Sequence, residues 1–458
     1  MSEYDVIIIG AGISGLTTAY LLHKKGYNIL VLEKNDSVGG HIKTTHHEGF
    51  QLEAGPHSFL GSSEYIWKLI EKLDFESQAI AASSEAKNRY IYRNKKLHPL
   101  PLSPFSFLKT PLLSLKAKGR LMIEPFIPNG AKEEETAWDF FQRRFGKEAA
   151  TYIMSPFVSG VYAGNVEKLG AKAAFPKFWQ FENDSGSMIW GAFKYMRAKK
   201  KRFNKEGLSS RKGLYSFKQG LGQITKLLGE KLKNNIRKEI DVLHIKKESE
   251  TYHLHFGDHT IKTKTLVIAT PPKEATKLLS SVMADSVKLL NEIPMAPVTL
   301  IHWTVPKNIP IPPGFGFLMP KINNKRVLGT LFPSYLFPNR APDGHILLAS
   351  FYGGMLDPIA CGLSASLLTN LLLQEHKEIF NTDLAQAKIL KITRYEQAIP
   401  QLLPTHLSII DTIEKALKTC PGIFLAGNYI TGVGMEQAVA SGFQAAEKTE
   451  YYLKKRKP

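Results

Sequence analysis

The chain has 458 residues with 43% hydrophobic content, enough for a large core and typical of two or three domains. Its two cysteines, Cys361 and Cys420, lie far apart without CxxC or histidine-ligand spacing, which excludes a disulfide framework and a structural zinc site and predicts a reducing, cytoplasmic compartment. The formal net charge of +19 favours an anionic partner, such as nucleic acid, anionic lipid or a carboxylate-rich substrate.

The apolar run near the amino terminus is predicted to belong to a folded domain and not to a secretory signal. Glu3 and Asp5 precede it where a signal needs positive charge, and Gly10, Gly12 and Gly15 interrupt it. No later stretch reaches the ~18 uninterrupted apolar residues of a membrane-spanning helix. We therefore expect a soluble or peripheral protein.

The first 33 residues carry the pattern of a dinucleotide site. "DVIIIG" suits a buried parallel strand, "GAGISG" supplies the GxGxxG spacing, and "LTTAYLLHKKG" is a helix that ends at Gly26. Gly10 permits the tight turn, Gly12 lets a pyrophosphate approach, and Gly15 allows close helix packing. The exposed amides and positive dipole end of that helix attract an anion.

One acidic residue and a second pair of glycines indicate which dinucleotide binds. "NILVLE" is the second strand, and Glu33 at its tip can accept hydrogen bonds from a ribose hydroxyl pair, which disfavours the 2'-phosphate of NADP. "SVGGHIKT" (37–44) adds a second glycine pair directly after this acid. That pair favours FAD over NAD because it brings more backbone close to the cofactor.

Two later segments are predicted to return to the same nucleotide fold. "KEIDVLHIKKESETYHLHFGDHTIKTKTLVIATPP" alternates with period two, turns at Gly257 and Asp258, and ends in an apolar strand. "PGIFLAGNYITGVGMEQAVASGFQAAEKTEYYLKK" supplies another short strand, a glycine-rich turn and a closing helix. The cofactor domain is therefore expected to be discontinuous.

The remaining residues form two inserts. The region near 96–204 contains helix-compatible stretches such as "AWDFFQRRFGKEAATYIMSPFV", and the region near 286–409 contains strands "VTLIHWTV", "RVLGTLF" and "HILLASFYGG" followed by a helix from about Ser364 to Phe380. We predict an α/β fold with a discontinuous Rossmann-like FAD-binding domain (1–75, 205–285 and 410–458), a mixed-sheet substrate-binding domain (76–95 and 286–409) and a mainly helical insert (96–204).

The densest basic run is "RAKKKRFNKE" (Arg197 to Glu206). A solvated loop is the favoured interpretation, and a patch that faces lipid or steers substrate is the alternative. No nucleic-acid partner is expected, because no helix-turn-helix, finger or aromatic-interleaved pattern accompanies the charge.

Together the motifs resemble the FAD-dependent porphyrinogen oxidases, which oxidise protoporphyrinogen or coproporphyrinogen in heme synthesis, within the amine-oxidase-like flavoproteins. "GAGISGLTTAYLL", "GLYSFKQGLGQITKLL" and "LAGNYITGVGMEQAVASG" match the wider superfamily, whereas "EAGPHSF", "NRYIYRNKKLHPLP" and "SGVYAGNVEKL" carry the specificity. The resemblance spans almost the whole chain.

The resemblance implies a set of FAD contacts, held without a covalent bond because the terminal turn contains no cysteine or histidine. Each residue also has an ordinary structural explanation; Val242, for example, is distinguished only by its place in the meander. The implied contacts are Gly10, Ala11, Gly12, Ile13, Ser14, Gly15, Glu33, Lys34, Gly40, Gly55, Pro56, His57, Ser58, Val242, Gly427, Val433, Gly434 and Met435.

The resemblance also implies the chemistry. A porphyrinogen loses hydride from its meso carbons to the flavin in three rounds, oxygen reoxidises the flavin with release of hydrogen peroxide, and Arg89 binds a substrate propionate. No nucleophile arrangement is legible, so we name no catalytic acid or base, and no metal is expected. His41 replaces the arginine of many amine-oxidase relatives, which disfavours the alternative of an amine or carotenoid-type oxidoreductase. A flavin-bearing binding protein without turnover is a third alternative.

The helical insert has two equally weighted interpretations. Its segment "LPLSPFSFLKTPLLSLKAKGRLMIEPFIP" mixes apolar residues with lysines, as in a peripheral attachment to the inner face of an anionic membrane, or it is an ordinary helical lobe. The positive charge tilts the substrate weakly towards coproporphyrinogen III, which has four propionates, over protoporphyrinogen IX, but anionic lipid would use the same charge. The sequence leaves the oligomeric state open.

Overall fold

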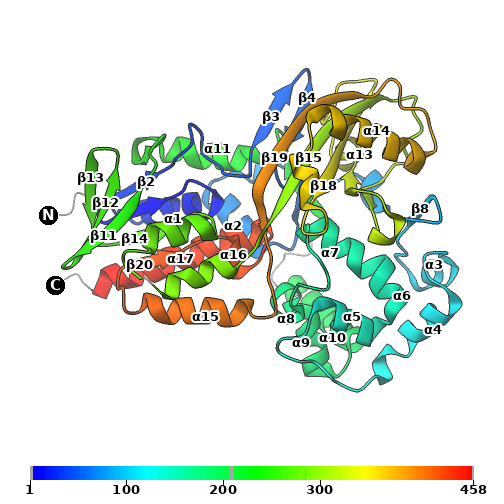
Figure 1. Ribbon diagram of the computed structural model, residues 1–458, viewed down its shortest axis with the longest axis horizontal. Helices are drawn as coiled ribbons and strands as arrows, with labels where there is room; N and C mark the ends of the chain where they lie inside the picture. Colours follow the sequence, from blue (N-terminus) through cyan, green and yellow to red (C-terminus); the bar gives the residue numbers. More distant parts are fainter. Residues whose placement is uncertain (1–3, 206–210, 284, 456–458) are drawn as a thin grey trace.

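A computed structural model describes residues 4–205, 211–283 and 285–455. Figure 1 shows three regions: a parallel sheet with helices at the left, a mixed sheet at the upper right and a helical lobe at the lower right. The two ends of the described chain both lie at the left, in the region with the parallel sheet (Figure 1).

The parallel sheet is assembled from distant parts of the sequence. Its strand order is β10-β2-β1-β14-β20, and every neighbouring pair is parallel. These strands are β1 (Val6–Ile9), β2 (Ile29–Leu32), β10 (Ile236–Arg237), β14 (Leu266–Ile268) and β20 (Ile423–Leu425). The discontinuous arrangement agrees with the prediction that the beginning, middle and end of the chain share one sheet.

Both faces of this sheet are covered, which explains its continuous apolar strands. Val6 and Ile8 join one core with helices α1 (Ile13–His23), α2 (Glu64–Lys72), α11 (Gly222–Lys231) and α17 (Met435–Lys455). Ile7 and Ile9 join the opposite core. That core also contains residues of the β-meander β11 (His244–Glu248), β12 (Thr251–Phe256) and β13 (His259–Thr263), and of helices α12 (Pro272–Leu279) and α15 (His406–Leu417).

The mixed sheet has seven strands in the order β19-β15-β18-β17-β16-β7-β8. Adjacent strands are antiparallel except β16 and β7, which are parallel. The strands are β7 (Arg89–Arg93), β8 (Lys96–Pro99), β15 (Met295–Pro306), β16 (Gly316–Leu318), β17 (Val327–Leu331), β18 (His345–Gly353) and β19 (Lys388–Pro400). Helix α14 (Ala365–Phe380) packs into the core of this sheet, close to its predicted bounds.

Smaller elements connect these two sheets. The hairpin of β3 (Thr44–His47) and β4 (Phe50–Glu53) packs through Phe50 and Leu52 against Leu347 of β18. A three-stranded sheet has the order β5-β9-β6. Its strands are β5 (Phe59–Leu60), β6 (Ala79–Ala81) and β9 (Leu214–Phe217), and the short helices α13 (Pro333–Leu336) and α16 (Asn428–Thr431) complete the connections.

The helical lobe is organised around aromatic residues and buried ions. Phe140, Phe141 and Phe175 form part of its apolar core, and Arg144 forms ion pairs with Glu124 and, at 3.4 Å, with Glu182, with all three side chains inaccessible to solvent. The helices are α3 (Pro104–Lys109), α4 (Leu115–Met122), α5 (Ala137–Phe145), α6 (Lys147–Ala149), α7 (Ser155–Tyr162), α8 (Ala171–Ala174), α9 (Pro176–Ser185) and α10 (Met188–Lys205), with a π-helical turn over Ala150–Met154.

The expected domain boundaries remain predictions, and several elements cross them. Strand β8 pairs with β7, so the insert takes its helices from residue 104 onward and not from 96. The 3₁₀ turn Ser286–Glu292 places Val287 and Leu290 in the core beneath the parallel sheet, and α15 runs across the expected boundary at 410. The basic run Arg197–Glu206 extends beyond the described residues.

Candidate functional site

The first glycine turn has the geometry of a phosphate cradle. Gly10 has φ +103°, and a Cβ there would lie 2.7 Å from the Ala269 carbonyl oxygen, whereas a Cβ on Gly15 would collide with the Gly10 carbonyl oxygen. A Cβ on Gly12 would meet nothing within 4 Å, so open space adjoins this residue. Helix α1 begins here without a side-chain cap. Its free amides therefore suit a diphosphate, which a larger residue at position 12 would displace.

Glu33 is buried beside this turn and is held by the protein. Its Oε2 accepts from the Ala11 amide at 2.7 Å, and its Oε1 accepts from the Asn35 amide at 2.9 Å and from Asn35 Nδ2 at 2.6 Å. This places a fixed carboxylate at the end of β2, where a ribose is expected. Because Ala11 N–H is engaged, an anion at the turn must rely on the amides that begin α1. Lys34, the next expected contact, is exposed.

The second glycine pair lies directly against the first turn. The Gly39 amide donates to the Ala11 carbonyl at 2.8 Å, and a Cβ on Gly40 would lie 3.3 Å from the Gly12 Cα. Gly39, which was not among the predicted contacts, has φ +108° and has no room for a side chain beside Ile42 and Thr225. The double glycine in "SVGG" is the sequence pattern from which Gly39 could have been predicted as a contact.

The turn before the last helix, α17, lies beside the first glycine turn. The Ser14 hydroxyl donates to the Ala438 carbonyl at 2.7 Å, so the first turn of α1 lies against the first turn of α17. The Ser14 hydroxyl proton is therefore engaged, so a phosphate at this turn would take its hydrogen bond from the Ser14 backbone. The predicted residues Val433, Gly434 and Met435 lead into α17, and the Gly427 amide donates to Ser441 Oγ at 2.9 Å. Two positive helix ends thus converge on one site.

The loop Gly55–Ser58 closes the junction with the mixed sheet. A Cβ on Gly55 would collide with the His41 carbonyl oxygen, so this loop and the second glycine pair are in direct contact. Pro56 and Ser58 are half-buried, while the His57 side chain is buried with its ring 6.1 Å from that of Phe351. The His41 ring lies 4.6 Å from the Tyr395 ring of β19.

Two buried histidines meet behind this loop. The His57 and His302 ring centroids are 6.0 Å apart, and burial, followed by the charge of Arg340, lowers the pKa of His57 to about 4. Burial, with His57 and Lys391 as further causes, lowers the pKa of His302 to about 3. Both rings are therefore neutral at neutral pH. The sequence analysis did not identify His302, because a single histidine within a β-strand has no local pattern that marks it as functional.

Val242 lies outside a strand, in the segment between β10 and β11. It is buried, and the Ile240 amide two residues earlier donates to the Glu33 carbonyl at 2.9 Å. Within the described residues no hydrogen bond to the Val242 backbone is formed. Its backbone thus stays available near Glu33, as a contact to an adenine would require.

Arg89 lies apart from these residues, at the start of β7. It is exposed, and its guanidinium carbon lies 5.2 Å from the Phe315 ring centre. No carboxylate of the described residues pairs with it. Arg93, four residues on, instead pairs with Glu148 at 2.9 Å and lies over Tyr152, which ties β7 to the helical lobe.

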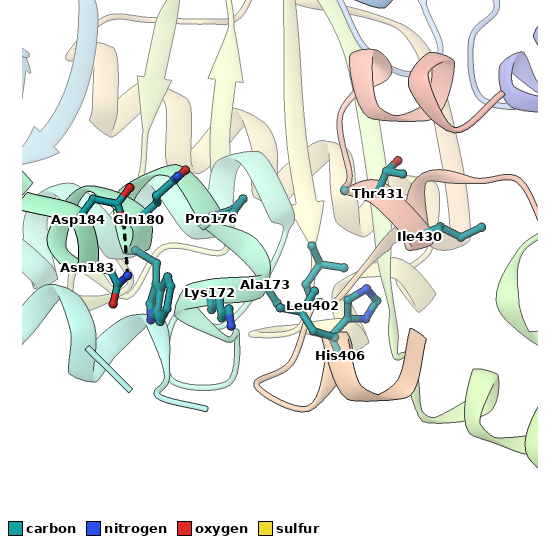
Figure 2. A pocket seen from close by; sticks show the side chains of 13 residues that line it. Lys172, Ala173, Pro176, Gln180, Asn183, Asp184, Leu402, His406, Ile430 and Thr431 are labelled. Atoms are coloured by element: carbon teal, nitrogen blue, oxygen red, sulfur yellow. Dashed lines mark hydrogen bonds between the residues drawn. The ribbon is translucent and has the colours of Figure 1, made fainter. Parts of the chain in front are cut away.

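A surface hollow of about 400 Å³ separates the helical lobe from the parallel-sheet region. Figure 2 shows Lys172 and Asn183 on the side of the lobe facing His406 and Thr431 on the other. Gly432, which also lines it, directly precedes the turn Val433–Met435. The hollow therefore reaches the edge of the predicted cofactor turn. Among the described residues no cluster of His, Cys, Asp or Glu could hold a metal ion.

Residues 13–449 match the family model described as flavin containing amine oxidoreductase. Protoporphyrinogen oxidase 1 of Arabidopsis thaliana is 30% identical, with 98% of this chain and 88% of the relative covered. Coproporphyrinogen III oxidase of Bacillus subtilis is 26% identical, with 98% of each chain covered. A crystal structure from Exiguobacterium sp. 255-15 has a TM-score of 0.83 at 23% identity and covers 99% of this chain and 100% of that one, which shows the shared fold.

Proposed function

Because the chain belongs to the flavin containing amine oxidoreductase family, we propose that it oxidises a porphyrinogen to the porphyrin in heme biosynthesis. The observation that carries this proposal is the similarity, over 98% of the chain, to relatives named protoporphyrinogen oxidase and coproporphyrinogen III oxidase. The substrate is therefore protoporphyrinogen IX or coproporphyrinogen III. The family binds a flavin. The identity of that flavin in this chain, and whether it is bound covalently, are part of the proposal.

We propose that the flavin is FAD, bound without a covalent bond. The cradle fits a dinucleotide: the space at Gly12 accommodates a diphosphate, Glu33 faces the ribose, and the amino termini of α1 and α17 lie beside it. The Val242 backbone would meet the adenine. The FAD, when bound, supplies the oxidation by taking a hydride.

The protein's own residues bind and orient the substrate and exclude water. The sheet face beside the His57 loop offers Phe351, Ala398 and Ile399 as partly buried apolar side chains for a tetrapyrrole. Arg89 would bind a propionate, because a planar guanidinium takes a carboxylate in two parallel hydrogen bonds. Holding the ring in one orientation accounts for catalysis without a side-chain nucleophile.

We further propose oxygen as the electron acceptor, with hydrogen peroxide as its product, and a peripheral membrane contact through the helical lobe. None of the described helices is both long enough and apolar enough to cross a bilayer. However, Leu115, Met122 and Phe126 are 84%, 63% and 86% exposed, and Trp190 and Phe193 on α10 are more than half exposed. Exposed Lys116, Lys194 and Arg197 interleave with them, a composition suited to an anionic bilayer surface.

Turnover of both porphyrinogens, side by side and with and without oxygen, tests the function. Porphyrin fluorescence should appear with one or both substrates and should require oxygen in the multiple-turnover reaction. A purified yellow protein that oxidises an amine but neither porphyrinogen would contradict the proposal. Denaturation should release free FAD into the supernatant, whereas flavin retained on the unfolded chain would contradict non-covalent binding.

A further inference from the structure

Two buried histidines lie at the junction of the candidate cofactor loop and the mixed sheet. His57 follows β4 and is 7% exposed, and His302 lies on β15 and is 1% exposed. The Nε2 of His57 and a ring nitrogen of His302 are buried and form no hydrogen bond among the described residues, whereas the Glu53 backbone lies within hydrogen-bonding reach of the His302 ring. An unsatisfied buried polar group destabilises a fold by about 1 to 3 kcal/mol. Two such atoms in one place call for a functional explanation.

The pair lies between a site wall and the half-buried polar residues Lys391 and Thr45. On one side the His57 ring lies 6.1 Å from that of Phe351, which belongs to the partly buried apolar wall described above. On the other side His302 pairs in register with Lys391 of β19. The Lys391 Nζ donates to the hydroxyl of the half-buried Thr45 at 3.1 Å.

The separation of the two rings suits transfer through one intermediate. Their centroids are 6.0 Å apart with an angle of 32° between the planes. A single water between the rings would be able to form hydrogen bonds to both. A neutral imidazole can accept a proton on one nitrogen and release a proton from the other. Such a pair therefore moves a proton without keeping a charge.

Burial and the positive charges that face the two histidines keep both rings neutral, and a neutral ring can accept a proton. Arg340 acts on His57 and Lys391 acts on His302, and with burial they hold both rings neutral at neutral pH. The carboxyl of Glu53, on β4, also lies in this region; burial raises its pKa to about 7 despite hydrogen bonds from Leu221 and Thr44. The nearby positive charges also disfavour any lasting protonation, so a proton taken up by the pair is passed on.

We propose that His57 accepts the proton released in each oxidation round and that His302 is the positioning residue that relays it towards Lys391 and the surface. This inference rests on the proposed function. In each round a meso C–H bond breaks and its electron pair leaves as hydride to the flavin. As the hydride leaves, the lone pair of the adjoining pyrrole nitrogen forms a C=N bond, the N–H bond of that nitrogen breaks, its electron pair stays on nitrogen, and His57 takes the proton. In one of the three rounds the proton comes from a meso carbon instead of a nitrogen, so that three hydrides and three protons leave in total. Because the cationic N–H is acidic, a weak base is sufficient.

The test uses the FAD-loaded enzyme and anaerobic mixing with each porphyrinogen, so that flavin reduction is followed in one turnover. His57→Gln and His302→Gln should each slow reduction about 100-fold, flatten its pH dependence and remove its solvent deuterium effect. The affinity for the product porphyrin should change less than about 2-fold. His376→Gln is the matched control, because His376 is equally buried but its ring is hydrogen-bonded to Thr330, Ser350 and Leu372.

Reduction at the parent rate in both variants, or a loss that equals the His376→Gln effect or follows lost flavin, would overturn the proposal. A parent enzyme that oxidises neither porphyrinogen instead refutes the proposed function. Nitrogen-15 NMR of labelled histidines in the loaded parent protein gives a second measurement that needs no variant to fold. Neutral rings at pH about 7 for His57 and His302 support the relay, and doubly protonated rings refute it.

Discussion

The Ser14 hydroxyl donates a 2.7 Å hydrogen bond to the carbonyl of Ala438, a residue 424 positions later in the chain. The Thr18 hydroxyl adds a second bond to the Gly442 carbonyl at 3.0 Å. These contacts hold the amino-terminal halves of α1 and α17 together, and Gly442 has no room for a Cβ beside the Ser14 carbonyl. The anion site is therefore built only when the last helix docks on the first.

Gly12→Val should weaken flavin binding without unfolding the protein. A Cβ at position 12 meets no atom within 4 Å apart from its chain neighbours, so we expect the apoprotein to accommodate the valine, which fills the space assigned to the diphosphate. We expect flavin affinity to fall by more than about tenfold, or 1.4 kcal/mol. Flavin absorbance per protein and thermal unfolding are the measurements. Gly119→Val in α4, where a Cβ also meets nothing within 4 Å, is the control, and equal flavin loss in both variants would contradict the assignment.

Glu124→Gln should destabilise the helical lobe in a pH-dependent way. Burial opposes ionisation of Glu124, yet hydrogen bonds from Ser187, the Met188 amide and Arg144 prevail and hold its pKa below the ordinary value. Removing the charge leaves buried Arg144 poorly compensated, at a cost of about 3 to 5 kcal/mol at neutral pH.

The sign of the pH effect follows from the lowered pKa. The stabilisation is complete above the unfolded carboxyl pKa of about 4.3 and is lost as the pH falls through the lower folded value. Urea unfolding at pH about 7 and at pH about 3 should therefore show that the difference in free energy of unfolding between parent and variant is smaller at the lower pH. Glu414→Gln, which breaks an exposed pair with Lys448, should change stability by less than about 1 kcal/mol. A difference that is the same at both pH values would contradict this account.

The sequence predicted what depends on neighbouring residues and missed what depends on distant pairing. The glycine turn, Glu33, the meander and helix α14 each follow from local spacing, turn chemistry or periodicity. Strand β19 was missed because "KILKITRYEQAIP" is half-exposed and shows no clean alternation, and only its pairing with β15 defines it. The His57–His302 contact likewise joins a loop to a strand far along the chain. The burial of Glu124 was invisible, since its partners follow more than 60 residues later in Ser187 and Met188.

Phe126→Ser combined with Trp190→Ser should weaken binding to anionic vesicles. The Ile189 amide donates to Glu124 Oε2 at 3.2 Å, which brings the start of α10 beside the 122–126 segment and makes one apolar surface of the two. Losing two exposed aromatic side chains should lower vesicle affinity by at least about tenfold.

Sedimentation with anionic vesicles at low and high salt measures this binding. Leu367→Ser is the control, because Leu367 is 55% exposed but lies on α14 of the mixed-sheet region. Parent protein that fails to sediment at low salt, or a control that loses as much binding as the double variant, would contradict a lipid-facing lobe.

Arg89→Ala should lower kcat/KM for the porphyrinogen by roughly 10- to 100-fold while flavin content stays unchanged. The physical reason is the loss of a bidentate, charge-assisted pair with a propionate, worth about 1.5 to 3 kcal/mol. The Arg89 side chain is exposed and its guanidinium lies 5.2 Å from the Phe315 ring centre, so its removal should leave thermal unfolding nearly unaffected. Arg89→Lys should recover part of the activity, since a point charge remains without the planar fork.

The choice of control follows from the structure. Arg93 is unsuitable as a neutral comparison, because Arg93→Ala breaks its pair with Glu148 and its contact with Tyr152 and should destabilise the lobe. Lys87, exposed two residues before Arg89, is the better match for charge and position. Steady-state kinetics with each porphyrinogen should separate Arg89→Ala from Lys87→Ala by the full expected factor, because only the former removes the carboxylate fork. If the two variants keep the same kcat/KM, or if Arg89→Ala loses flavin before activity, Arg89 does not bind the propionate.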